Sequence, residues 1–393
     1  MISVKDQNRV GIDAILFALY LVSAPIHQVL LLPNGSTITK YLAFATMIAC
    51  VAFGGVRELN NSVLWLLITI IVWFAVTMIW SRSLSASWTS LVSIISYLAL
   101  FLIVCSKEWS DREKHLFILA IIVSCVYYGV LLIQAAATMK RASIISNESG
   151  KEADQNVLSA NIGIAVLFAI DVLLKTNKRI IKASMIGAIV IIVSGIIATG
   201  SRGALIALAV SAIYYSQANG RINKKNKWII VGIIFGVVVF LFILLSKNLL
   251  NNETVVSRYT TEVDDSHRFE IWKNYLKVLW DRPWGFLLGF GYGASNLEYG
   301  DYFNTKWPPA THSDYLHILF ESGFIGLLFV LRLVNVVWKA SKKTGNYIGN
   351  ACVVLMLTAG LTVDMFTRYG WWNALIFAAI GIGVSNSNGT EEA

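Results

Sequence analysis

Two of the five histidines of this chain lie in one short stretch, residues 311–326, in which a polar head precedes a long apolar run. The head, residues 311–314, contains His312, and it lies where water would give way to hydrocarbon if the apolar run crossed a membrane. A histidine with an ordinary pKa can remove a proton from a hydroxyl group at neutral pH. The stretch therefore predicts acid–base chemistry at a membrane surface, with His312 as the base.

Two arginines and one carboxylate are the other candidates for the same site. Arg202 and Arg268 each present a planar fork of donors that matches phosphate oxygens and keeps its charge when partly buried, so the pair suits a diphosphate. Asp364 lies near the end of a later apolar segment, where a carboxylate is costly unless it has a partner. It would orient His312, bind a substrate hydroxyl, or form a structural salt bridge with Arg368 or Arg202.

The surroundings of Arg202 allow two interpretations. This arginine lies in the short joint G-S-R-G, residues 200–203, between two apolar segments. Its side chain either snorkels from the membrane to water or contacts a ligand that comes close to the glycine backbone.

Arg268 lies at the start of a segment, residues 266–282, whose apolar residues have helical spacing and which Pro283 ends. This pattern predicts an amphipathic helix in the membrane interface. A cation in the first turn of a helix opposes the helix dipole, so Arg268 needs another partner. An anionic ligand, Glu270 or Asp264 would each supply one.

Two further polar positions have simpler explanations beside a functional one. His27, near the end of the first apolar segment, either lines a cavity or is an ordinary interfacial histidine. Asp154 precedes another apolar segment, where helix capping alone would explain an aspartate.

The chain shows no pattern of a metal site or a disulfide framework. The acidic run Glu262, Asp264 and Asp265 is typical of a solvated surface, and the cysteines never occur as close pairs in loops. They are Cys50, Cys105, Cys125 and Cys352. We therefore expect neither a metal nor a cofactor.

Composition predicts an all-helical, polytopic integral membrane protein that forms a single transmembrane domain over residues 1–393. Of its 393 residues 56% are hydrophobic and only 14% are charged, which is far more apolar than a soluble protein of this length. A helix needs about 20 apolar residues to cross a membrane. Twelve such spans fit, at residues 11–32, 38–56, 62–80, 86–105, 116–138, 157–174, 182–199, 203–219, 228–245, 314–337, 348–365 and 371–384.

The net charge of +9 follows from topology. If both termini are cytoplasmic, seventeen of the 32 Lys and Arg residues fall in short cytoplasmic stretches, which together carry a net charge of +10. This is the positive-inside pattern, so we do not expect a nucleic-acid partner. The one long connection, residues 246–313 between the ninth and tenth spans, is then extracytoplasmic, and its aromatic content predicts that it folds against the membrane. Its glycines at 285, 289, 291 and 293 predict sharp turns near the active face.

The order of the motifs resembles a known family. S-R-G at 201–203 lies between two spans, R-x-x-x-W at 268–272 is followed by the glycine-rich stretch, and H-S-x-x-L at 312–316 precedes E-x-G-x-x-G at 321–326. This ordered set, from about residue 154 to 364, is similar to the O-antigen ligase and polymerase superfamily. Ser313 replaces the usual asparagine, and residues 154–156 lack the usual central proline; both departures concern local geometry.

The resemblance implies a metal-independent, inverting glycosyltransferase. Carried over position by position, Arg202 and Arg268 would hold the diphosphate of an undecaprenyl-diphosphate-linked glycan donor, and His312 would activate the acceptor hydroxyl. Asp364 falls where ligases of this family carry a functional aspartate, so it is a substrate-binding candidate. The acceptor would be a glycan or a lipid-linked glycan in the bilayer. A chain-length regulator and other polysaccharide-assembly membrane proteins are further candidate partners.

Three classes of function are compatible with a chain of this kind. The leading one is a repeat-unit polymerase for O-antigen, capsule or exopolysaccharide, and its alternative is an O-antigen ligase that joins finished glycan to lipid A core or another surface acceptor. A lipid-linked glycan transporter or flippase is a more distant class. Such proteins tend to show internal repeats and charges near mid-membrane, whereas this sequence shows no clear repeat and its informative charges gather at the expected outer surface. An intramembrane protease is disfavoured because G-S-R-G lacks a nucleophile-elbow spacing. The expected location is the bacterial cytoplasmic (inner) membrane, with the active face extracytoplasmic.

Overall fold

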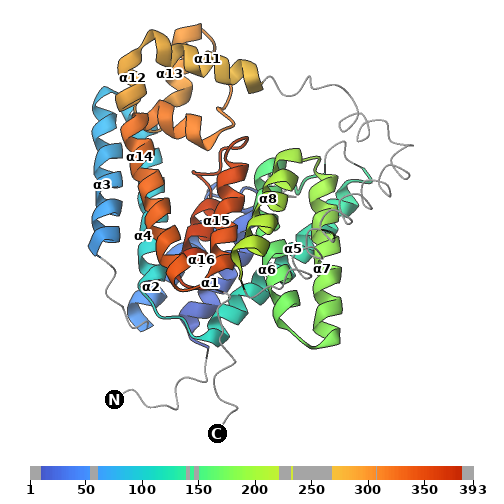
Figure 1. The fold of residues 1–393 in the computed structure, drawn as a ribbon. Helices are drawn as coiled ribbons and strands as arrows, with labels where there is room; N and C mark the ends of the chain where they lie inside the picture. The colour runs from blue at the N-terminus through green and yellow to red at the C-terminus, as the bar shows by residue number, and fades with distance from the viewer. Residues whose placement is uncertain are drawn as a thin grey trace.

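The computed structural model describes residues 10–53, 61–138, 142–145, 150–220, 232, 268–306 and 308–382. Within these ranges every regular element is a helix (Figure 1), so the all-helical class that the sequence predicts is confirmed for them. The elements are α1 (Ile12–Ser23), η2 (Ala24–Ile26), α2 (Ile38–Phe53), α3 (Asn61–Thr77), η3 (Met78–Trp80), α4 (Leu84–Cys105), α5 (Asp111–Ala135), α6 (Gln155–Lys175), α7 (Arg179–Ala198), α8 (Arg202–Ala218), α11 (Arg268–Asp281), α12 (Pro283–Leu288), α13 (Ser295–Phe303), α14 (Asp314–Lys343), α15 (Tyr347–Ala359) and α16 (Tyr369–Ala379).

Six of these helical segments are long and apolar enough to cross a membrane: α3 with η3, α4, α5, α6, α7 and α14. Three shorter apolar segments are α1 with η2, α2 and α15. The predicted spans 203–219 and 371–384 correspond to α8 and α16, which have 17 and 11 residues, and the predicted span 228–245 lies outside the described residues. The helices indicate a multi-pass membrane protein, and the number of twelve spans stays a prediction.

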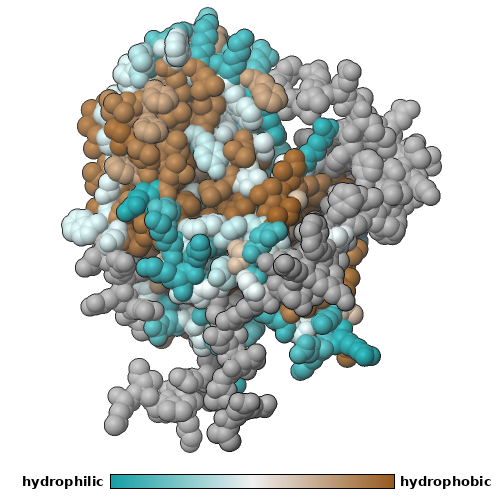
Figure 2. All heavy atoms as spheres, in the orientation of Figure 1, coloured by the Kyte–Doolittle hydropathy of each residue, from teal (hydrophilic) through white to brown (hydrophobic). Residues whose placement is uncertain are grey.

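The surface of the bundle is apolar where lipid would contact it. Large hydrophobic side chains are well exposed on α2 and α3, among them Phe44, Val51 and Trp65. Hydrophobic surface also covers the side of the molecule where α3 lies (Figure 2). In contrast, 83% of the residues in the most apolar 18-residue stretch of α6 are buried, whereas 22% are buried in the corresponding stretch of α3. Helix α6 therefore lies in the centre of the bundle, and α3 lies at its edge.

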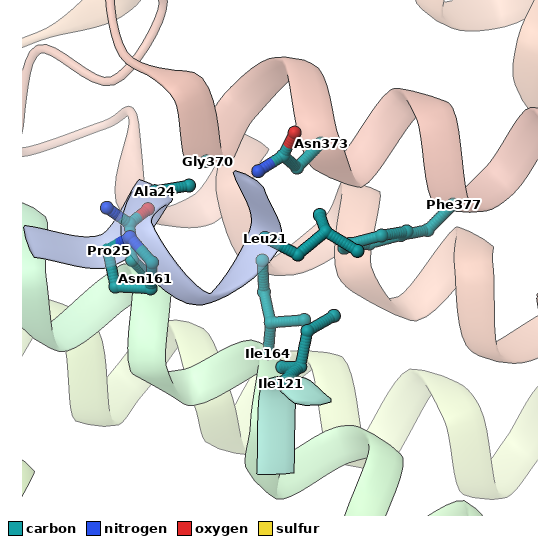
Figure 3. A pocket seen from close by; sticks show the side chains of 9 residues that line it. All are labelled: Leu21, Ala24, Pro25, Ile121, Asn161, Ile164, Gly370, Asn373 and Phe377. Carbon is teal, nitrogen blue, oxygen red and sulfur yellow. The ribbon is translucent and has the colours of Figure 1, made fainter. Parts of the chain in front are cut away.

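A small cavity lies where η2, α6 and α16 meet (Figure 3). Asn161 of α6 packs against Gly370 so closely that a Cβ on Gly370 would overlap the Asn161 amide. The Tyr20 hydroxyl donates to Asn373 Oδ1 at 2.7 Å nearby. The cavity volume of about 20 Å³ is the space that one water molecule needs. These contacts join α1 and α16, the first and last α-helices of the described bundle, beside the central helix α6.

Helix α14 is interrupted at Gly323, which has φ 69° and ψ −178°. This backbone breaks the helical hydrogen-bond ladder, so carbonyl groups just before it are free to accept from other segments. The Phe320 and Glu321 carbonyls accept the N–H groups of Phe290 and Gly291 at 2.8 and 3.0 Å. The predicted span at 314–337 is therefore interrupted at Gly323, and the break is the docking site for the glycine-rich segment, residues 285–293.

Glycine is required on both sides of this contact. Gly289 and Gly323 both have positive φ, and a Cβ on Gly289 would lie 2.5 Å from the Gly323 nitrogen. On the outer side of the contact, Trp80 Nε1 donates to the Gly289 carbonyl at 2.9 Å and Trp73 Nε1 donates to the Ser322 carbonyl at 2.8 Å. The sharp turns predicted for the glycines thus serve to join α3, α12 and α14.

Candidate functional site

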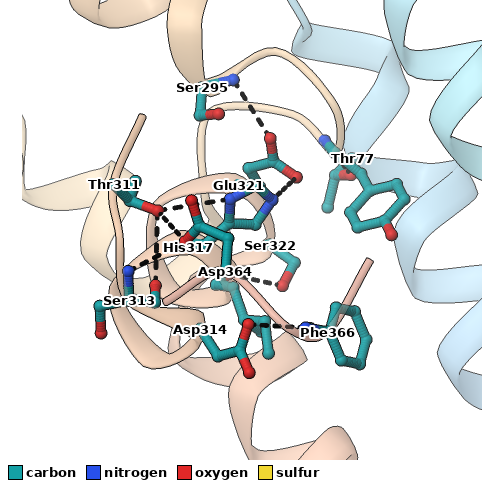
Figure 4. Close-up of polar contacts among 12 residues, drawn as sticks. Thr77, Ser295, Thr311, Ser313, Asp314, His317, Glu321, Ser322, Asp364 and Phe366 are labelled. Carbon is teal, nitrogen blue, oxygen red and sulfur yellow. Dashed lines mark hydrogen bonds and ion pairs between the residues drawn. The ribbon is translucent and has the colours of Figure 1, made fainter. Parts of the chain in front are cut away.

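One carboxylate holds the turn that precedes α14. Asp364 Oδ1 accepts the Thr311 hydroxyl at 2.6 Å and the Ser313 N–H at 2.9 Å (Figure 4). Asp364 Oδ2 accepts the His312 N–H at 3.1 Å. Hydrogen bonds to an ionised acceptor are roughly twice as strong as neutral ones. Asp364 therefore orients His312 through the backbone. The salt bridge of Asp364 with Arg368 or Arg202 that the sequence left open is not formed among the described residues.

His312 has a left-handed backbone, with φ 50°, which is uncommon for a residue other than glycine. Such a conformation persists only where its surroundings over-determine it. Here the Thr311 carbonyl accepts from Trp272 Nε1 at 2.9 Å, while Asp364 holds the next two N–H groups. The imidazole is half-buried and, within the described part of the chain, makes no hydrogen bond or ion pair. The turn is fixed, and the ring is left available to a ligand.

A second carboxylate makes the reciprocal contact. Asp314 Oδ1 accepts the N–H groups of Met365 and Phe366 at 2.6 and 2.7 Å, and the Asp314 N–H donates to the Gly360 carbonyl at 2.8 Å. Asp314 is only 4% exposed; both donors serve Oδ1, whereas Oδ2 has no hydrogen-bond partner within the described chain. The first turn of α14 and the loop between α15 and α16 are therefore locked together from both sides.

A polar chain continues from this lock toward the glycine-rich segment. Thr311 Oγ1 lies 3.5 Å from His317 Nδ1, His317 Nε2 lies 3.1 Å from Glu321 Oε2, and Glu321 Oε1 accepts the Ser295 N–H at 3.3 Å. Figure 4 shows the His317 ring between Thr311 and Glu321. His317 thus belongs to the same polar network as the turn that carries His312.

Helix α11 is attached to the residues that lead into this turn. Besides the bond from Trp272 to Thr311, the Tyr275 hydroxyl donates to the Pro309 carbonyl at 2.9 Å. Burial, together with the carboxylates of Asp364 and Glu321, raises the pKa of the Tyr275 phenol well above its usual range, so it stays a donor. Arg268 lies one helical turn before Trp272 and hence on the same face, and its Nε is buried. The R-x-x-x-W spacing therefore brings Arg268 to the side of α11 that faces the His312 turn.

Arg202 is the first residue of α8 and is half-buried. Its neighbour Gly203 packs against the loop between α15 and α16, where a Cβ would lie 2.6 Å from Thr362 Oγ1. Gly200 has φ 73°, a conformation that glycine adopts without steric cost. Both glycines of the joint thus have explanations within the chain, and the first turn of α8 lies beside the segment that carries Asp364.

The segments of all four predicted site residues therefore meet. Asp364 contacts the His312 turn directly, Trp272 ties the Arg268 helix to that turn, and Gly203 places the Arg202 helix next to Thr362. Three of these residues belong to the ordered sequence motifs: Arg202 to S-R-G, Arg268 to R-x-x-x-W and His312 to H-S-x-x-L. A family model described as O-antigen ligase matches residues 187–331.

The match supports assignment of this chain to the O-antigen ligase and polymerase superfamily. No curated protein matches the chain. The matched range contains Arg202, Arg268 and His312, whereas Asp364 lies beyond its end. Asp364 is connected to the matched range by its hydrogen bonds to residues 311–313.

Sequence reasoning missed three residues of the site: Asp314, His317 and Glu321. The signal for the last two was present, because a histidine and a glutamate at i and i+4 lie on one helix face. Asp314 had no such signal, since its partners are 51 and 52 positions away. Among the described residues, no group of three or more His, Cys, Asp or Glu side chains is arranged to hold a metal ion.

Proposed function

We propose that this superfamily member is an inverting membrane glycosyltransferase. It transfers an undecaprenyl-diphosphate-linked oligosaccharide or polysaccharide to a sugar hydroxyl on the extracytoplasmic face of the bacterial cytoplasmic membrane. The observation that carries the proposal is the left-handed His312 turn, held by Asp364 and Trp272 with the imidazole left available. The superfamily assignment supports the same chemistry.

The proposed mechanism needs one base and two cations. The His312 imidazole accepts the proton of the acceptor hydroxyl while the hydroxyl oxygen attacks the anomeric carbon of the donor sugar. The bond from that carbon to the diphosphate oxygen breaks, and the diphosphate leaves with the electron pair. Arg202 and Arg268 neutralise the charge that develops on the leaving oxygens. Attack from the side opposite the leaving group inverts the anomeric configuration.

The chain's main contribution in this mechanism is positioning. A lipid diphosphate is already a good leaving group, so the site gains more from holding the reactants in line and stabilising charge than from a strong acid. Asp364 serves this purpose by fixing the backbone of the base. The mechanism involves no metal ion, and we propose the transferase as metal-independent.

Within this class we propose a repeat-unit polymerase, with a ligase as the second candidate. The family match is compatible with both. A strain that lacks the gene separates the two. Loss of all long chains, with single units still joined to the surface acceptor, supports the polymerase. Long chains that stay on the lipid carrier overturn the polymerase in favour of the ligase.

The test of the transferase is a reaction of the purified chain with lipid-linked glycan, using His312→Asn beside His312→Ala. Asparagine tolerates positive φ, so the first variant removes the base and keeps the turn. We expect transfer to fall by about 10²–10⁴-fold, the usual contribution of a general base, with donor binding kept. Substantial transfer by His312→Asn would remove the base assignment. Movement of labelled lipid-linked glycan across vesicles without new glycosidic bonds would replace the enzyme by a transporter.

A further inference from the structure

A second cavity, larger than that of Figure 3, lies beside the candidate site and is not used by the proposed mechanism. Its volume is about 330 Å³, and four segments line it: the connection between η2 and α2 through His27 and Thr37, residues 89–97 of α4, Tyr292, and residues 367–369. Every lining residue except Ile94 has a polar side-chain atom. In a chain this apolar, polar side chains between membrane helices are expected to mark a functional cavity.

The charge of this cavity is positive. Arg368 is the one permanent charge among its lining residues, none of which is acidic, and no carboxylate of the described chain lies within 4.0 Å of its guanidinium. Arg368 Nε is buried and has no hydrogen-bond partner within the described chain. A buried donor without an acceptor is costly, and a guanidinium is best satisfied by a carboxylate or a phosphate. The cavity is therefore built to receive an anionic group.

The α4 side of the cavity offers acceptors for hydroxyl groups. Thr89 and Ser93, one turn apart on α4, donate to the carbonyls of Ser85 and Thr89 at 3.0 and 2.9 Å. Tyr97, one turn further, donates to the Thr367 carbonyl at 3.0 Å. Because their protons are engaged, the three oxygens are left as acceptors, and all three residues line the cavity. A ligand that complements this wall carries several hydroxyl groups.

The rest of the wall is rigid. The Tyr369 ring lies edge to face with the rings of His27 and Tyr97, with centroids 5.1 Å apart in both pairs, and Tyr292 stacks on Phe74 at 4.2 Å. A preformed cavity of this volume lies at the lower end of the range for ligand pockets, roughly 300–1,000 Å³. Such a space suits one or two sugar rings and, with a single aliphatic residue in its lining, does not suit a lipid chain.

We infer that this cavity binds an acidic sugar, one that carries a carboxylate or a phosphate group, with Arg368 as its anchor. Arg368 lies four residues after Asp364, and Tyr292 follows Gly291, which donates to the Glu321 carbonyl. One lining segment of the cavity thus contacts the His312 turn, and another contacts α14 at its break. The inference rests on the proposed function only in taking the sugar to be part of the glycan that the site handles.

The test is binding to the purified full chain in nanodiscs, measured by saturation-transfer NMR with glucuronate, glucose 6-phosphate and glucose as probes. Inorganic phosphate, which has no carbon-bound proton, is measured as a competitor of bound glucose 6-phosphate. We expect at least one acidic sugar to bind about tenfold or more tightly than glucose, a difference of about 1.4 kcal/mol. Arg368→Gln should reduce that binding to the level of glucose, and Thr89→Val should weaken it several-fold. Arg332→Gln, at an exposed arginine of α14 that does not line the cavity, should leave binding unchanged.

Three results would overturn the inference. The first is equal binding of glucose and the acidic sugars. The second is unchanged binding by Arg368→Gln in a chain that keeps its thermal midpoint, and the third is binding of inorganic phosphate as tight as that of glucose 6-phosphate, which would mean an anion site without a sugar. If Arg368→Gln fails to fold, Arg368→Lys and Thr89→Val decide. The lysine variant loses the bidentate contact, and the valine variant loses a hydroxyl acceptor. Binding of the acidic sugar as tight as in wild type by both variants would overturn the inference. His312→Asn should still bind the acidic sugar, so failure of the transferase and failure of this cavity give different results.

Discussion

Asp314 and Asp364 lie in segments far apart in the chain, and each accepts backbone N–H groups from the other's segment. Asp364 holds His312 and Ser313, and Asp314 holds Met365 and Phe366. Because both segments are loops or helix starts, their N–H groups lack partners of their own. This exchange closes the end of α14 against the loop between α15 and α16, and it sets the position of the proposed base.

Asp364→Asn should impair transfer more than it impairs folding. Asparagine keeps one oxygen for the turn and loses the charge that strengthens three hydrogen bonds, each worth about 1.5–3 kcal/mol when charged. We expect transfer to fall by at least about tenfold, since a small displacement of a reacting group is enough for that loss. Steady-state transfer rates and thermal midpoints measure the two effects. Ser313→Ala, which keeps the backbone donor, is the control, and full activity of Asp364→Asn would contradict the role of the lock.

His317 and Glu321 should be energetically coupled. Their side chains are 17% and 3% exposed and lie 3.1 Å apart, and removing one partner of a buried pair costs about 3–5 kcal/mol. The single variants His317→Ala and Glu321→Ala, with the double variant, form a double-mutant cycle on the free energy of unfolding. Residues in contact give interaction energies of about 0.5–3 kcal/mol. Additive effects of the two substitutions would exclude the pair from the network.

Gly323→Ala should destabilise the protein strongly. Alanine at φ 69° is strained by about 1–3 kcal/mol, and its Cβ would overlap the backbone of the glycine-rich segment. Gly187→Ala is the control, because Gly187 lies in α7 with open space around its Cα and alanine is favoured in a helix interior by roughly 0.8–1.0 kcal/mol. Thermal midpoints should fall for the first variant and hold or rise for the second. Equal midpoints would mean that the break in α14 is not required.

Arg268→Ala should weaken binding of the lipid-diphosphate donor. The proposed contact is charge-assisted, and its loss should raise the donor KM by about tenfold, or about 1.4 kcal/mol, with a smaller change in kcat. Arg332→Ala, an exposed arginine on α14, is the control for loss of one positive charge. Titration of the donor in the transfer assay separates the two constants. A fall in kcat with unchanged KM would assign Arg268 to the transition state alone.

The helical class and the membrane location could be predicted from the sequence, because in lipid only helices and closed barrels satisfy every backbone group and the apolar windows have helical length. The R-x-x-x-W spacing was legible for a similar reason: two residues four positions apart share a helix face. The residue types also limited the chemistry, since arginine suits phosphate and histidine titrates near neutral pH. None of these conclusions needs a contact between distant segments.

Only the tertiary structure decided how the distant segments meet. Asp364 was visible as a costly carboxylate, but its donors lie 51 to 53 positions earlier, and no local pattern encodes that pairing. The break at Gly323 looked like helix until its carbonyls were seen to accept from residues 290 and 291. The Arg368 cavity is made by four segments and has no counterpart in any single stretch. The sequence by itself determined what these side chains can do, and long-range packing determined which of them act together.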